Sequence, residues 1–187
     1  NSAEFNISKY LVQGENEILA VVSKWSTGTY LECQDMFREN GIFRDVLLTT
    51  LDKTYLYDFV VDTEKKYGKY ELSVSFKIEG DKEGCTISAE LLDGDKVLAK
   101  ETADARAKSK IIFSNLYVKE WNAEEPYTYD LFITFEDANG NKTYVKNITG
   151  FKTVEIKGNI FYFNDMPIKF KGVNHHDTNM KTGYVLT

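Results

Sequence analysis

Hydrophobic and polar residues alternate in short runs from about Thr50 onward. The clearest run is Lys69 to Ile78, where every second side chain is apolar, as in a strand with one buried face. Two polar stretches that contain glycine, 93–96 and 137–141, predict tight turns. The pattern predicts strands over residues 55–61, 69–78, 85–92, 97–99, 110–118, 127–135 and 142–148. Short strands with this spacing fit an antiparallel, immunoglobulin-like β-sandwich over residues 51–152.

The pattern changes on both sides of this region. Residues 17–22 are mostly apolar and predict a strand that is buried on both faces. Residues 160–170 predict a hairpin that turns at Asn164 and Asp165. A helix over 102–110, which contains three alanines, would bury little apolar surface, so this stretch predicts a loop or an edge strand.

Composition and charge narrow the class of protein. Twelve Tyr and twelve Phe against two Pro favour a mainly β chain. The formal net charge of −6, without basic clusters, argues against a nucleic-acid partner. No apolar run approaches the roughly 20 residues that cross a bilayer, which argues against a membrane partner. The two cysteines, Cys33 and Cys85, cannot form a disulfide framework, and they predict reduced thiols in a cytoplasmic protein.

The stretch from Tyr30 to Val46 combines many charges with large apolar side chains. A surface loop seldom carries so many apolar residues, and a core strand seldom carries so many charges. The stretch therefore has two interpretations: a packed segment that presents charges to a cleft, or a structural network of ion pairs.

The sequence of this region, Trp25 through Val46 (WSTGTYLECQDMFRENGIFRDV), resembles a signature of the large retaining β-galactosidases of glycoside hydrolase family 2. Its Gly-Ile-Phe-Arg end, 41–44, also resembles the related β-glucuronidases and β-mannosidases, whereas Gln34-Asp35-Met36 favours the galactosidase branch. Further along, Gly172-Val-Asn-His-His-Asp177 resembles the segment that opens the family's catalytic barrel.

The resemblance implies a three-part organisation. Residues 1–50 are expected to be the last strands and closing loop of a jelly-roll sugar-binding domain, and 51–152 an immunoglobulin-like domain. Residues 153–187 are expected to form a hairpin and the first strand of a truncated (β/α)8 barrel. The stretch Trp121–Tyr129 resembles a corner of the middle domain, where Trp121 is either a sugar-stacking platform or a buried anchor.

The same resemblance implies two binding residues. Asp35 matches an aspartate that contacts galactose and a sodium ion, with an ion pair to Arg38 or Arg44 as its structural alternative. His176 matches a histidine beside the galactosyl group. His175 and His176 would point to opposite faces of a strand, so they cannot share one metal ion. Asp177 stands where many relatives have glutamate, and Cys33 replaces a common acidic residue.

Retaining glycosidases use two carboxyl groups about 5–5.5 Å apart. In the family both catalytic glutamates lie on later barrel strands, so no catalytic residue is assigned here and the 187 residues are expected to be inactive and to bind no cofactor by themselves. The resemblance implies a parent that hydrolyses terminal β-D-galactosides with retention, uses Mg and Na, and forms homo- or hetero-oligomers. The isolated chain is expected to self-associate through unpaired strands. Another family 2 specificity, such as β-glucuronidase, and a non-catalytic carbohydrate-binding or adhesive β-sandwich remain alternatives.

Overall fold

The computed structural model describes residues 3–31, 41–42, 45–105, 110–183 and 186. The chain divides into two compact units. One comprises residues 49–171, and the other comprises 1–48 together with 172–187. Each unit is described by itself.

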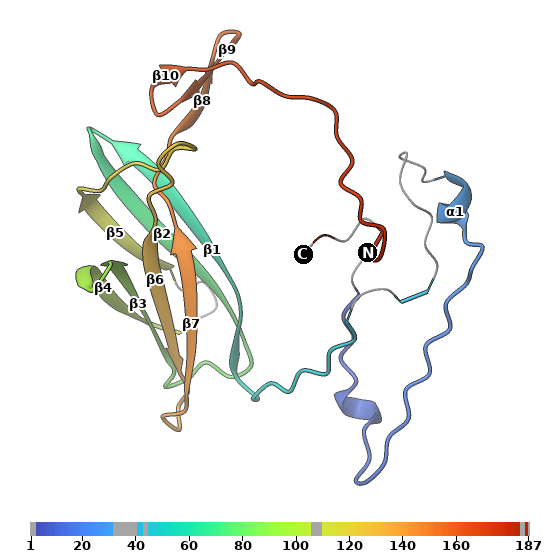
Figure 1. The fold of residues 1–187 in the computed structure, drawn as a ribbon. Helices are drawn as coiled ribbons and strands as arrows, with labels where there is room; N and C mark the ends of the chain where they lie inside the picture. The colour runs from blue at the N-terminus through green and yellow to red at the C-terminus, as the bar shows by residue number, and fades with distance from the viewer. Residues whose placement is uncertain (1–2, 32–40, 43–44, 106–109, 184–185, 187) are drawn as a thin grey trace. The chain divides into compact units, whose positions relative to one another are not determined.

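Unit 49–171 is built on two antiparallel sheets, which Figure 1 shows as the two layers of a sandwich. The first sheet has the order β1-β2-β5, with β1 at Tyr55–Lys66, β2 at Lys69–Glu79 and β5 at Lys110–Leu116. The second has the order β4-β3-β6-β7, with β4 at Lys96–Asp104, β3 at Thr86–Asp93, β6 at Tyr129–Glu136 and β7 at Lys142–Thr149. The predicted mainly β, antiparallel architecture is confirmed.

The core lies between the two sheets, where the alternating apolar side chains meet. All five apolar residues predicted for one face of β2 are buried: Tyr70, Leu72, Val74, Phe76 and Ile78. The second sheet contributes alternate side chains in the same way: Ile87, Ala89 and Leu91 from β3, and Leu131, Ile133 and Phe135 from β6. This burial of one face per sheet is what the period-two pattern requires.

Two strands extend well beyond their predicted ends. β1 continues to Lys66 and β4 to Asp104, through residues that are mostly polar. Each of these strands is at the edge of its sheet. An edge strand tolerates polar side chains, so the hydrophobic pattern does not mark its end. The part of 102–110 that the structure describes is therefore edge strand at Thr102–Asp104, followed by the buried Ala105.

A small third sheet follows the sandwich and lies at one end of it in Figure 1. It has the order β10-β9-β8, with β8 at Val154–Lys157, β9 at Ile160–Phe163 and β10 at Met166–Pro167. The predicted hairpin forms, and its turn residues Asn164 and Asp165 have positive φ values of 48° and 63°. Two consecutive residues with positive φ are typical of a two-residue hairpin loop.

The unit that contains 1–48 and 172–187 has little regular structure in its described part. It contains the 3-10 helix η1 at Ser8–Tyr10 and the helix α1 at Thr27–Leu31. Within the described residues, no helix is long and apolar enough to cross a membrane. Residues 172–178 are irregular, and an isolated bridge joins Asn179 to Gly183.

The buried strand predicted at 17–22 is wrong. These residues are extended without ladder pairing, and Ile18, Leu19 and Val21 are 73%, 83% and 85% exposed. A strand needs a neighbour that accepts and donates its backbone hydrogen bonds. No described segment pairs with 17–22, so its apolar pattern has no sheet to join.

Candidate functional site

Of the two predicted binding residues, only His176 lies in the described part of the chain. Asp35 and its possible partner Arg38 fall within 32–40, and Arg44 within 43–44, all outside the described residues. His176 is exposed in the irregular stretch before Asn179. Its neighbour His175 approaches Asp177, with Nδ1 and Oδ1 2.9 Å apart. The imidazole of His176 is therefore accessible for a hydrogen bond to a polar ligand.

No metal centre is formed by the described residues, since no group of three or more His, Cys, Asp or Glu side chains converges among them. The predicted sodium contact of Asp35 lies outside the described residues. A carboxylate is a suitable ligand for a hard cation. Such an ion needs several oxygen ligands, however: calcium takes six to eight, and magnesium keeps several water molecules beside one or two carboxylates. One aspartate is therefore insufficient as a site.

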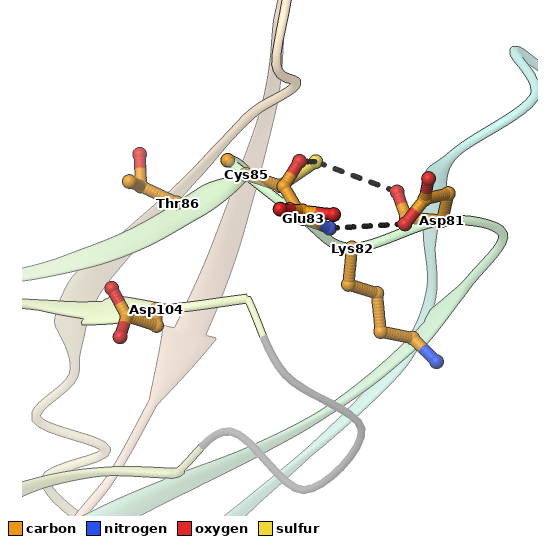
Figure 2. A pocket seen from close by; sticks show the side chains of 7 residues that line it. Asp81, Lys82, Glu83, Cys85, Thr86 and Asp104 are labelled. Atoms are coloured by element: carbon orange, nitrogen blue, oxygen red, sulfur yellow. Dashed lines mark hydrogen bonds between the residues drawn. The ribbon is translucent and has the colours of Figure 1, made fainter.

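A surface hollow with a volume of about 550 Å³ lies beside the start of β3. Figure 2 shows Asp81, Lys82 and Glu83 on one side of it and Asp104, from the end of β4, on the other. Cys85 is 4% exposed, and its Sγ lies 3.7 Å from the carbonyl oxygen of Asp81, to which the thiol donates. A covered thiol that donates to a carbonyl is a poor nucleophile. The thiol of Cys85 therefore gives the hollow no nucleophile.

A charged cluster lies where the sandwich meets the third sheet. The Lys65 ammonium lies 2.8 Å from Glu120 Oε1 and 2.9 Å from Asp165 Oδ2. The Tyr70 hydroxyl donates to the same Glu120 oxygen at 2.9 Å. We call Lys65, Glu120 and Asp165 the Lys65 bridge, because one ammonium joins carboxylates from two different parts of the unit.

The protonation of the Lys65 bridge follows from its hydrogen bonds. The bonds to Glu120 and Asp165 raise the pKa of Lys65, and the same ammonium lowers the pKa of Asp165. Burial raises the pKa of Tyr70, and its bond to Glu120 raises it further. At neutral pH the Lys65 ammonium and the Asp165 carboxylate are therefore charged, and the Tyr70 phenol is neutral.

Trp121, for which a sugar-stacking platform and a buried anchor were the two interpretations, is half-buried and packed against its neighbours. Its ring meets Phe163 edge-on at a centroid distance of 5.9 Å, and the Lys152 ammonium lies 5.0 Å from the ring centroid. A Cβ at Gly150 would lie only 3.0 Å from the Trp121 Cβ and 3.1 Å from its Cδ1. These contacts tie the indole to β9 and to the segment after β7.

Two family profiles match the chain. The profile described as "Glycosyl hydrolases family 2, sugar binding domain" matches residues 1–52, and that described as "Glycosyl hydrolases family 2" matches residues 54–152. The chain belongs to glycosyl hydrolase family 2.

Among family 2 relatives, the chain is similar to proteins named β-galactosidase along its whole length. That of Actinobacillus pleuropneumoniae is 38% identical over 191 residues, which cover 100% of this chain and 18% of the relative. Those of Streptococcus thermophilus and Halalkalibacterium halodurans are 36% and 38% identical and cover 99% of this chain. The chain thus spans about a fifth of the length of the curated relatives it matches.

Among solved structures, the chain resembles a β-glucuronidase from Ruminococcus gnavus in complex with D-glucaro 1,5-lactone. The TM-score is 0.60, the sequence identity is 22%, and the match covers 73% of this chain and 22% of that one. At this identity the likeness concerns the fold, which is shared by family 2 enzymes of different specificity.

Sequence reasoning missed the Lys65 bridge in this family 2 chain. Glu120 and Asp165 are 45 positions apart, and Lys65 is 55 positions before Glu120, so no short spacing links them. The one local signal was the Asn164-Asp165 turn, which predicted a hairpin but gave no indication of what the turn would contact.

Proposed function

We propose that the chain is part of a β-galactosidase that hydrolyses terminal, non-reducing β-D-galactosides with retention of configuration. The observation that carries this proposal is the identity of 36–38% to proteins named β-galactosidase over 99–100% of the chain. The β-glucuronidase likeness is weaker in sequence, at 22% over 73% of the chain. Glucuronide hydrolysis is therefore the second candidate, supported by fold alone.

In this proposal the 187 residues contribute binding groups and a scaffold, and the catalytic carboxylates come from elsewhere in the parent protein. Retention requires an acid/base and a nucleophile about 5–5.5 Å apart. We assign neither to this chain. His176 would donate or accept a hydrogen bond at the galactosyl group, and its exposure supports that role. Asp35 would contact the sugar and contribute one ligand to a sodium ion, and Mg would be a further ion of the parent.

The proposal extends to the setting of the parent. We expect a cytoplasmic homo- or hetero-oligomer that takes a small β-galactoside as substrate. The described Cys85 is a free, buried thiol, in keeping with a reducing compartment.

An activity assay with nitrophenyl β-D-galactoside tests whether the catalytic groups lie in the parent protein outside these 187 residues. The 187-residue chain should show no hydrolysis above background, whereas the full reading frame should be active. In the full-length protein, Asp35→Asn and His176→Ala should each lower kcat/KM at least about tenfold, equivalent to about 1.4 kcal/mol of lost transition-state binding. Full activity in both variants would contradict the assigned roles, and turnover by the 187-residue chain would contradict the absence of catalytic groups.

A further inference from the structure

The third sheet is too small to hold its orientation without help. Its strands have four, four and two residues, and all four residues of β8 are exposed. Isolated two- and three-stranded sheets need a packed face for stability. The contacts that tie β8, β9 and β10 to the sandwich therefore decide whether these parts move together.

The turn of the third sheet is tied to the sandwich by the side chain of Asn164. Its Nδ2 donates to the Trp121 carbonyl oxygen at 3.0 Å, and its Oδ1 accepts from the Thr153 amide at 2.9 Å. The Asn164 amide also donates to the Thr153 carbonyl oxygen at 3.0 Å. One residue thus connects the turn, the start of β8 and the segment that precedes β6.

Next to Asn164, the Lys65 bridge joins the same turn to β1. Asp165 comes from the turn, Lys65 from β1 and Glu120 from the segment before β6. The side chains of Lys65 and Glu120 are 26% and 30% exposed, so the pair is partly shielded from solvent. Without the ammonium, two carboxylates that now share it would face each other and repel.

The bridge also rests on the core. The Tyr70 hydroxyl that donates to Glu120 belongs to a ring packed edge-on against Phe151, at a centroid distance of 5.3 Å. Phe151 is fully buried, and it forms the second edge contact with Tyr129 at 5.2 Å. A displacement of Glu120 would therefore disturb buried aromatic packing.

We propose that Lys65 and Asn164 fix the third sheet rigidly on the end of the sandwich, so that β8, β9 and β10 move together with it. The last hydrogen bond of the hairpin is donated by the Ile168 amide to the Phe161 carbonyl oxygen at 3.0 Å. The Asn164 and Ile168 amides therefore report whether the third sheet stays attached.

Amide hydrogen exchange on the 187-residue chain tests the attachment. In Lys65→Met, which keeps the aliphatic stem and removes the ammonium, the Asn164 and Ile168 amides should exchange at least about tenfold faster, because the third sheet opens without the sandwich. The Ile133 amide in the core of β6 should keep its rate. Lys65→Arg should restore slow exchange. Lys146→Met, which removes a surface pair with Asp130 of 2.8 Å, is the matched control and should leave the hairpin unchanged.

Unchanged exchange of Asn164 and Ile168 in Lys65→Met would overturn the proposal. If Lys65→Met also makes the Ile133 amide exchange faster, the core itself is disturbed, and Asp165→Asn is the variant to use instead. The Asp165 side chain is 59% exposed, so its charge can be removed without disturbing the core. Faster hairpin exchange with an unchanged Ile133 amide supports the attachment in that variant, and an unchanged hairpin overturns it.

Discussion

Phe151 lies in a connecting segment, but its side chain is a central part of the packed core. It follows β7, has no exposed surface, and meets Tyr70 and Tyr129 edge-on at 5.3 Å and 5.2 Å. Its backbone also takes part, because the Trp121 amide donates to the Phe151 carbonyl oxygen at 2.8 Å. The Phe151 ring therefore joins the two sheets, and its carbonyl oxygen binds the segment that carries Glu120 and Trp121.

Replacing Phe151 should be among the most damaging single changes in the sandwich. Phe151→Ala should lower the free energy of unfolding by about 3–5 kcal/mol, through lost burial and the cavity left between two tyrosine rings. Tyr144→Ala, at a side chain 70% exposed on β7, is the control and should change it by less than about 0.5 kcal/mol. Urea unfolding followed by tyrosine and tryptophan fluorescence measures both. Equal losses in the two variants would contradict the central place of Phe151.

Asp137 makes the stability of the β6–β7 turn depend on pH. Its carboxylate accepts hydrogen bonds from the Asn141 side chain at 2.9 Å and from the Asn139 and Asn141 amides, and these bonds hold the pKa of Asp137 below its ordinary value. A carboxyl group with a lower pKa in the folded state than in the unfolded state stabilises the folded protein at pH values above its unfolded pKa. This stabilisation is lost as the pH falls through the folded-state pKa.

Asp137→Asn should therefore be less stable than the unmodified chain at pH 6, and the difference should shrink as the pH approaches 3. Urea midpoints of both proteins across that range measure the effect. A difference that stays constant with pH would show that the charge of Asp137 is not what stabilises the turn.

At the scale of elements, Gly80 allows the loop after β2 to pass close to the segment before β1. Its φ is +94°, and a Cβ there would collide with the Lys53 carbonyl oxygen and lie 2.8 Å from the Thr54 Cα. Gly80→Ala should therefore cost more stability than Gly94→Ala, whose φ is also positive, at +56°, but which has nothing within 4 Å of the added carbon. Both substitutions introduce backbone strain, so the difference in unfolding free energy isolates the collision. Equal losses would contradict the close approach.

The strands of the sandwich could be predicted from sequence because their apolar residues alternate. β2 shows this most clearly, with Tyr70, Leu72 and Val74 all buried. The far end of β1 was missed, since edge positions accept polar residues and the alternation is weak there. At the far end of β4, Thr102–Asp104 forms the edge strand that was one of the two predictions for 102–110. The strand predicted at 17–22 was wrong because an apolar run gives a tendency, whereas a strand also needs a hydrogen-bonding neighbour.

Residues of the candidate site could be predicted only where they lie in a sequence motif that resembles the family. The resemblance of residues 25–46 and 172–177 led to Asp35 and His176 as expected binding residues, and both roles remain predictions. The Lys65 bridge joins three residues that are far apart in sequence, so only the folded chain brings them together. The packing of Trp121 against Phe163 and Lys152 is likewise seen only in the folded chain.

At the scale of the molecule, unit 1–48 with 172–187 presents many large apolar side chains to solvent. Phe5, Leu19 and Val21 are 82%, 83% and 85% exposed, and Leu47 is 81% exposed. Exposed apolar segments with unpaired backbone groups favour association. Light scattering of the 187-residue chain should therefore show a mass that rises with protein concentration. A constant monomer mass up to the highest concentration would contradict this expectation.

The central claim is that this family 2 chain comes from an enzyme specific for galactosides. The most direct test is the ratio of kcat/KM for nitrophenyl β-D-galactoside and nitrophenyl β-D-glucuronide, measured on the full-length protein. The two sugars differ by a carboxylate at C6 and by the orientation of the hydroxyl at C4, and a site built for one should disfavour the other by about 10²-fold or more. A ratio of at least about 100 in favour of the galactoside is the predicted result. A ratio in favour of the glucuronide would contradict the claim.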